Sequence, residues 1–172
     1  MNRQDLKENE YHAYYSYYLN LIPALSSLES VLKTSLDSSI TFIKSIEKPL
    51  DYKYATDKWS IGEVILHNID TERIFSYRAL RFMRGDTMRL PGFDQDVFAS
   101  DYRNYAFAKA DLIQSLRVTR NATIELFKGV PDEQLLRQGI ASDSPMSVRV
   151  IPFLIAGPVS YTHLTLPTTP YV

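Results

Sequence analysis

The chain of 172 residues contains no cysteine and only three histidines. Without cysteine it forms neither disulfides nor thiolate metal sites, so histidine and the carboxylates remain as ligands and bases. Its 19 basic and 20 acidic side chains leave a formal net charge of −1, and such a chain has no net field to attract a phosphate backbone. It also lacks an apolar run long enough to span a membrane and an export-like amino terminus. We therefore expect a soluble, cytoplasmic protein that binds neither nucleic acid nor membrane.

The composition changes abruptly near the carboxyl end. Residues 158–172 are rich in Thr and Pro, carry no charged side chain and contain His163. They resemble the translation of a sequencing adaptor, and such segments are set aside before fold is considered. A genuine disordered tail is the alternative. We expect one domain over residues 1–157 and a non-native tail over 158–172, which makes His163 a poor candidate ligand.

Three stretches carry apolar residues at spacings of three and four, the pattern of an amphipathic helix. The first covers about residues 27–47 and ends before a proline. The second, 60–84, opens with Ser60 and Glu63 in capping-box spacing and closes at a glycine. The third covers about residues 105–128 and is followed by a glycine and a proline. The chain therefore contains at least three predicted helices.

A fourth apolar stretch begins after Ser147. Its high proportion of apolar residues suits a buried helix or strand, and the three preceding helices favour a helix that completes a bundle. Pro152 removes one hydrogen bond there, so we expect an irregular start. Residues 85–104 show no sustained period and predict a long loop, of the kind that is often functional or crosses a fold. With no convincing strand alternation, the prediction is an all-α four-helix bundle.

His67 is the one histidine inside a predicted helix. Glu63 and Thr71 lie four residues before and after it, on the same helix face, and Asp70 is adjacent. A neutral imidazole in this position can bind a divalent metal, with a carboxylate as a further ligand or as its orienting partner. From spacing alone, a purely structural histidine is the alternative.

Charged groups elsewhere have two interpretations each. Four arginines lie among aromatic residues of the second predicted helix: Arg73, Arg78, Arg81 and Arg84. We expect most of them to be solvated or paired with neighbouring acids, and the alternative is that one steers an anionic substrate. Asp94 and Asp96 are expected to cap a turn, with a second metal site as the alternative.

Four motifs together resemble one known family. Residues 59–67 read Trp-Ser-Ile-Gly-Glu-Val-Ile-Leu-His, and residues 70–81 continue the same helix. Residues 90–96 read Leu-Pro-Gly-Phe-Asp-Gln-Asp, and residues 144–149 read Ser-Pro-Met-Ser-Val-Arg. Taken together, these motifs resemble the DinB-like (DinB/YfiT) superfamily, particularly its small bacterial branch. The resemblance covers about residues 10–157.

The resemblance implies a four-helix bundle in which the second and third helices run parallel, joined by a long connection. It also implies a divalent metal, nickel or zinc, bound by one histidine on the second helix and a His-x-x-x-His pair on the fourth. His67 matches the first ligand. The side chains expected to line the site are Glu63, Asp70 and Thr71. The missing pair would fall at Pro158 and Thr162, so we expect a truncated fourth helix and weak or absent metal binding.

The resemblance further implies a metal-dependent enzyme that acts on a small-molecule substrate. A metal held by imidazoles lowers the pKa of bound water or thiol and so generates a nucleophile near neutral pH. The expected activity is that of a hydrolase or of a transferase using a low-molecular-weight thiol. The alternative is a metal-free helical interaction protein that forms homodimers through its helix faces, with His67 in a structural role.

Overall fold

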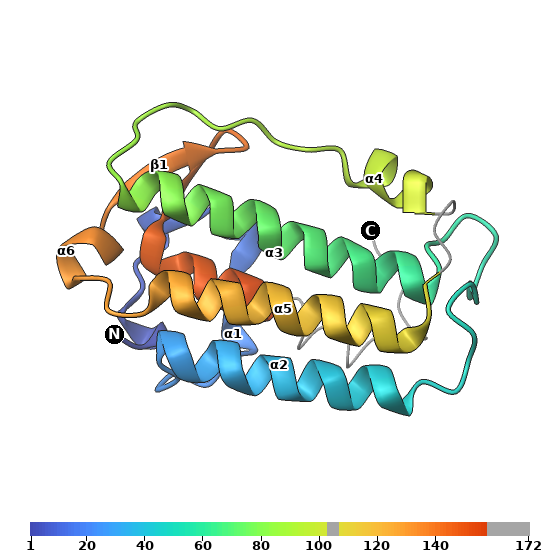
Figure 1. Cartoon of the computed structure of the whole chain (residues 1–172). Helices are drawn as coiled ribbons and strands as arrows, with labels where there is room; N and C mark the ends of the chain where they lie inside the picture. Colours follow the sequence, from blue (N-terminus) through green and yellow to red (C-terminus); the bar gives the residue numbers. More distant parts are fainter. Residues whose placement is uncertain (103–106, 158–172) are drawn as a thin grey trace.

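The computed structural model describes residues 1–102 and 107–157. Three long helices form the body of the molecule: α2 (Leu28–Ser45), α3 (Ile61–Met83) and α5 (Lys109–Phe127). A short 3-10 helix, η5 (Val148–Val150), leads into helical residues 151–157, which supply the fourth member. Figure 1 shows that α3 and α5 run in the same direction and α2 in the opposite one. The predicted bundle, with parallel second and third helices, is confirmed.

The long helices begin where local side chains satisfy their first backbone donors. In the capping box of α3, the Ser60 hydroxyl accepts from the Glu63 backbone N–H at 3.2 Å, and the Glu63 carboxylate accepts from the Ser60 N–H. Ser27 and Ser30 form the same arrangement at the start of α2. At its other end α3 gives way to Gly85, whose φ of 79° suits a residue without a side chain. The boundaries of α2 and α3 lie within two residues of the predicted ones, whereas α5 begins at Lys109 and not near residue 105.

The long connection between α3 and α5 contains a helix that the sequence pattern did not reveal. Helix α4 (Gln95–Asp101) starts at Asp94, whose carboxylate accepts from the backbone N–H groups of Asp96 and Val97 at 2.9 and 3.0 Å. The prediction of a loop without a helix over 85–104 is therefore wrong. The sequence pattern did not reveal α4 because a helix of this length is too short to display an apolar period. The capping role predicted for Asp94 is confirmed.

A β-hairpin precedes the fourth helix and corrects the expectation of no strands. Its strands, β1 (Gln138–Ala141) and β2 (Ser144–Ser147), pair antiparallel after the short helix α6 (Asp132–Leu135). Ser142 and Asp143 form the turn with φ values of 52° and 58°. Such turns are usually signalled by glycine or Asn-Gly, and the strands are only four residues long. Both features hid the hairpin from pattern analysis.

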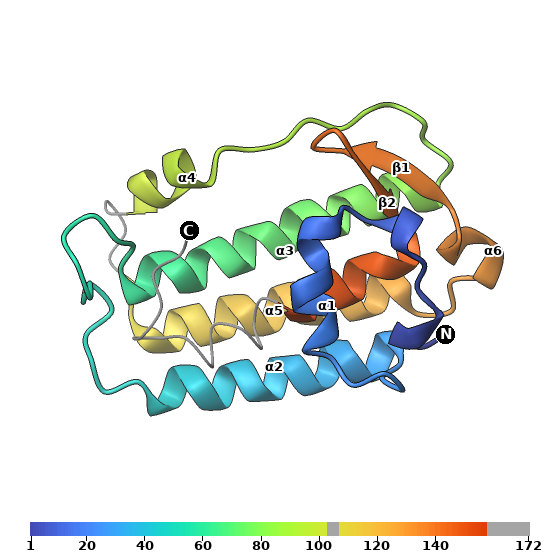
Figure 2. The same ribbon diagram turned by 180° about the vertical axis from the view of Figure 1, so that it is seen from behind.

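The amino-terminal segment crosses the helix formed by residues 151–157 (Figure 2). It consists of η1 (Arg3–Asp5), η2 (Glu8–Glu10), η3 (Ala13–Tyr15) and α1 (Ser16–Asn20). The buried Glu10 carboxylate accepts from the Ser147 hydroxyl at 2.7 Å and from Arg149 Nε at 2.8 Å. Because Ser147 also caps η5, this contact joins the amino terminus to the start of the fourth helix.

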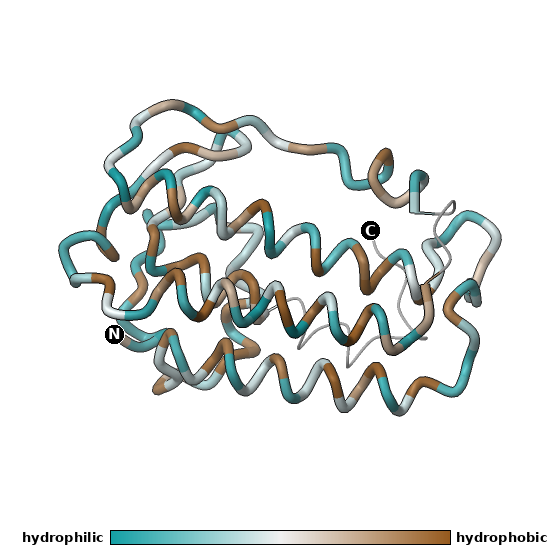
Figure 3. The backbone as a smooth tube through the Cα atoms, in the orientation of Figure 1, coloured by the Kyte–Doolittle hydropathy of each residue, from teal (hydrophilic) through white to brown (hydrophobic). Residues whose placement is uncertain are grey.

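The core divides into two clusters along the bundle, and apolar positions line its inward faces (Figure 3). Core one combines the amino-terminal segment, the second half of α3, the hairpin and residues 148–156. Core two is built from α2, α3 and α5, with Ile43, Ile65 and Leu112 among its members. In the described ranges, no helix is both long enough and apolar enough to cross a membrane.

Candidate metal centre

His67 lies on α3 between two aromatic side chains. Its ring centroid is 4.9 Å from the Trp59 ring and 6.4 Å from the Phe93 ring. Trp59 immediately precedes the capping residue of α3, whereas Phe93 belongs to the connection that returns over this helix. The Thr71 hydroxyl lies 3.5 Å from His67 Nε2, one helical turn away. The imidazole is therefore half-buried and surrounded mainly by rings.

Burial lowers the pKa of His67, and the nearby carboxylates of Asp70 and Asp96 only partly oppose this effect. The imidazole is consequently neutral near pH 7 and carries a free lone pair, the form that binds a metal ion. The surroundings of His67 thus keep its imidazole in the unprotonated form that a metal ligand requires.

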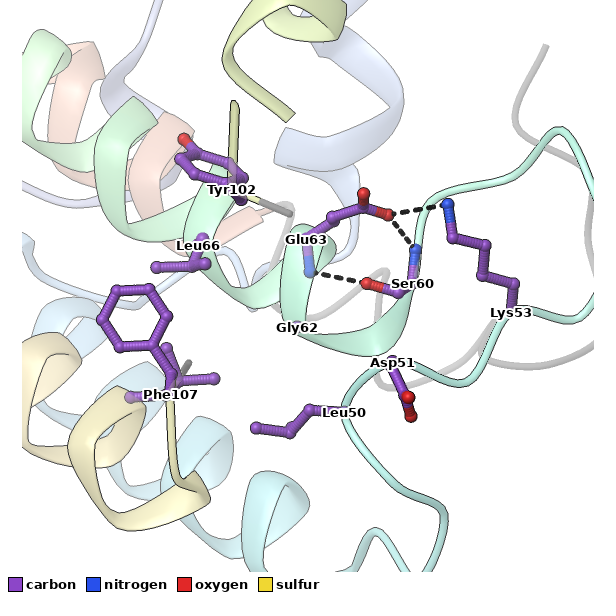
Figure 4. Close-up of a pocket in the computed structure, with 10 residues that line it drawn as sticks. Leu50, Asp51, Lys53, Ser60, Gly62, Glu63, Leu66, Tyr102 and Phe107 are labelled. Carbon is purple, nitrogen blue, oxygen red and sulfur yellow. Dashed lines mark hydrogen bonds and ion pairs between the residues drawn. The ribbon is translucent and has the colours of Figure 1, made fainter. Parts of the chain in front are cut away.

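Glu63 lies one turn before His67 and is only 4 % exposed. Its carboxylate already caps α3 at Ser60 and forms an ion pair with Lys53 at 3.3 Å. Beside it is a cavity of about 420 Å³ (Figure 4). Apolar side chains, including Leu66 and Phe107, form one wall of this cavity. Glu63 therefore contributes to a pocket wall and to the helix cap together.

The two acids that influence His67 also have partners of their own. Asp70 accepts a hydrogen bond from the Tyr102 hydroxyl and pairs with Arg73 at 2.8 Å. Burial, aided by the Asp70 hydrogen bond, raises the pKa of Tyr102, so this phenol stays protonated as the donor. Asp96 accepts from Trp59 Nε1 at 3.1 Å. Neither carboxylate is held by His67.

These contacts decide how well the site fits a metal. Within residues 1–102 and 107–157, no group of three or more His, Asp or Glu side chains is arranged to hold an ion. His67 supplies one imidazole and Thr71 one hydroxyl, which does not make a three-ligand centre. Pro158 and Thr162, where the resemblance places the other two ligands, lie outside the described residues.

The arginines of α3 follow the predictions with one exception. Arg73 pairs with Asp70, Arg81 pairs with Asp86, and Arg84 is exposed. Arg78 is instead only 2 % exposed, and no carboxylate contacts it in the described part of the chain. The expectation for most of these arginines therefore holds, and Arg78 is the exception because the hairpin and the returning connection contact it.

The motifs at 59–67 and 90–96 contain Trp59 and Phe93, but the sequence did not indicate that either ring lies beside His67. Trp59 is close to His67 along the chain, yet a helix period does not say where a residue before the cap will point. Phe93 is brought there by the chain reversal after α3. The recurrence of aromatics in the two motifs that flank the site was the available signal.

Comparison with known proteins agrees with this architecture. The solved structure of YfiT from Bacillus subtilis, described as a probable metal-dependent hydrolase with an unusual four-helix bundle topology, superposes with a TM-score of 0.67. The match covers 81% of this chain and 82% of that one at 14% sequence identity, and so concerns the fold. A search of curated proteins gave no significant match. The family model of the DinB superfamily matches residues 32–157, and the chain belongs to this superfamily.

Proposed function

We propose that the protein is a DinB-type metal-dependent enzyme in which His67 is the first ligand of a nickel or zinc ion. The observation that carries this proposal is the weak engagement of its imidazole. His67 is half-buried, and its single hydrogen-bond contact in the described ranges is the 3.5 Å one to Thr71. A structural histidine would gain stability from stronger partners, whereas a ligand needs a free nitrogen.

The remaining ligands belong, on this proposal, at the positions of Pro158 and Thr162. Residues 151–157 are helical, and positions four apart on a helix share one face. Two imidazoles at these positions would provide the paired ligands that the described residues lack. The chain with Pro158 and Thr162 in place is expected to bind zinc or nickel weakly or not at all, since one imidazole does not hold either ion.

We propose one of two reactions: hydrolysis of a small-molecule substrate, or transfer of a low-molecular-weight thiol to such a substrate. When bound, the metal would supply a nucleophile by lowering the pKa of water or thiol. The residues of this chain provide the setting: Trp59 and Phe93 shield His67, and the cavity beside Glu63 gives space for a small substrate. Its apolar wall favours a molecule with an apolar body, and the Lys53 ammonium at this cavity is already paired with Glu63.

Titration of zinc and nickel into tag-free protein tests the ligand assignment. The double variant Pro158→His/Thr162→His should bind one equivalent, while the chain as it stands should show at least tenfold weaker binding. Adding His67→Ala to the double variant should abolish binding with little change in helical circular dichroism. Undiminished binding without His67, or a folded double variant that binds no metal, would overturn the proposal.

The loaded double variant then separates the two reactions. Release of nitrophenol from simple esters without added thiol supports a hydrolase, and consumption of a thiol with an electrophile supports a transferase. If no metal binds and sedimentation shows a dimer that His67→Ala leaves intact, the metal-free interaction protein becomes the better description.

A further inference from the structure

The 90–96 segment, defined as residues 90–96, extends from the connection after α3 into the first turn of α4 and runs alongside α3 (Figures 1 and 2). It brings Phe93 to the His67 ring and Asp96 to the indole N–H of Trp59. Most of the segment is exposed, and only Leu90 is fully buried. Its own packing therefore provides little to hold it in place.

Few hydrogen bonds attach this segment to the rest of the molecule. The backbone of Leu90 donates to Ile140 O at 2.9 Å and accepts from Ser142 N at 3.1 Å. The next attachment is Pro91 O, which accepts from Arg78 Nη2 at 3.1 Å. In the described ranges, no other side chain outside the segment bonds to its backbone before α4 begins.

Arg78 occupies an unusual environment for this contact. The same Nη2 donates to Ser142 Oγ at 2.9 Å, and the guanidinium lies 5.2 Å from the Phe75 ring centroid. Burying a cation without a carboxylate is unfavourable before compensation. The cation–π contact offsets a part of this. An aliphatic side chain would fill the space at less cost, so the donors themselves have a role.

Helix geometry places Arg78 where it can act on the site from a distance. Arg78 follows His67 by three turns of α3 and lies on the same face, roughly 16 Å along the axis. The 90–96 segment runs in the opposite direction, with Pro91 at Arg78, Phe93 at His67 and Asp96 at Trp59. Fixing the segment near one end therefore sets where its rings and carboxylate meet the site.

We propose that Arg78 is a positioning residue that joins the hairpin turn to the 90–96 segment and so holds Phe93 and Asp96 over the His67 site. The importance of the His67 site rests on the proposed function, whereas the contacts of Arg78 with Pro91 and Ser142 are independent of it. Removing the donors of Arg78 should release the segment while leaving the helices in place.

Trp59 is the one tryptophan of the chain and gives a direct measurement. Its ring centroid is 4.9 Å from that of His67, and His67 lies roughly 16 Å from Arg78 along α3, so a change at Arg78 reaches Trp59 only through the intervening structure. In Arg78→Met we expect a red-shifted Trp59 emission, greater quenching by acrylamide and a displaced indole N–H resonance. Asp96→Ala supplies the reference for an indole without its acceptor. Arg78→Lys should recover part of the wild-type signal.

The matched control is Arg81→Met, which removes a neighbouring arginine that pairs with Asp86 and does not touch the 90–96 segment. It should leave the Trp59 signals unchanged. A folded Arg78→Met protein with wild-type Trp59 signals would overturn the proposal. If Arg78→Met does not fold, Ser142→Gly decides, because it removes the hydroxyl that joins Arg78 to the hairpin turn, and wild-type Trp59 signals in that variant would equally overturn the proposal. None of these readouts needs metal, so failure of metal binding at His67 is distinguishable.

Discussion

The two ends of the bundle are built in different ways. Around core one, the amino-terminal segment, the hairpin and residues 148–156 enclose α3, and almost every side chain of 148–156 is buried. Around core two, α2, α3 and α5 pack on one another, and no residue of 148–157 belongs to that cluster. His67 lies beside core two, under the thinly attached 90–96 segment.

On the proposed function, the site and the more enclosed core lie at different ends of the molecule. The end at core one has interlocked elements and a buried ion pair between Glu10 and Arg149. The end with His67 has an imidazole with one weak hydrogen bond and, one helical turn away at Glu63, a cavity. Sites for ligands are commonly placed in the less stable parts of a protein. We therefore expect substitutions around core one to lower the free energy of unfolding more than a substitution of His67 does.

The largest expected effect lies between the two cores. Arg120 donates from Nε and Nη2 to the Glu72 carboxylate at 2.8 and 3.0 Å, and from Nη1 to Leu32 O. Arg120→Met leaves the Glu72 charge buried without its partner, and we expect the free energy of unfolding to fall by about 3–5 kcal/mol. Urea denaturation measures it. The exposed Lys33, paired with Glu29, is the control, and Lys33→Met should change stability by less than about 0.5 kcal/mol. Equal effects would contradict the prediction.

A glycine in the hairpin gives the next largest effect. A Cβ at Gly139 would lie 2.0 Å from a ring carbon of the buried Phe82. Gly139→Ala should therefore destabilise the protein by about 3 kcal/mol through overpacking. At Gly92, in the 90–96 segment, the nearest atom to a Cβ is Ser142 Oγ at 3.4 Å. Gly92→Ala should be close to neutral in thermal denaturation, and a loss as large as that of Gly139→Ala would refute the contrast.

The amino-terminal contact should make core one sensitive to acid. Burial works to raise the pKa of Glu10, but hydrogen bonds from Arg149, Ser147 and the Lys7 backbone outweigh it and hold the pKa below its ordinary 4.5. The stabilisation is thus complete above pH 4.5 and is lost as pH falls through the lowered pKa. Glu10→Gln should cost about 2 kcal/mol at pH 7 and progressively less below pH 4.5. The exposed Glu8 is the control, and a pH-independent difference for Glu10→Gln would exclude this linkage.

The smallest effect on stability is expected at His67 itself. Its half-buried ring has one weak hydrogen bond, so His67→Ala should reduce the free energy of unfolding by less than about 1 kcal/mol. Ile65, two residues earlier and buried in core two, is the matched position. Ile65→Ala should cost about 2–5 kcal/mol. A comparable loss for His67→Ala in urea denaturation would identify His67 as mainly a core residue.

Local patterns predicted the helices well because their causes are local. The capping pair Ser60 and Glu63, the apolar spacing of α3 and its glycine stop all lie within one stretch of chain. The same reasoning missed α4, which is too short to show a period, and the hairpin, whose turn at Ser142 and Asp143 lacks glycine. For the site, sequence singled out His67 but not the aromatic rings that enclose it.

By itself, then, the sequence determined three long amphipathic helices, their caps and a histidine on the face of one of them. These features depend on interactions between residues three or four positions apart, and such spacings are visible in the sequence. Only the tertiary structure decided that Phe93 closes over His67, that Arg78 is buried against Pro91 and that Glu10 meets Arg149. Each of these contacts joins residues remote in sequence, and their geometry follows from how the elements pack together.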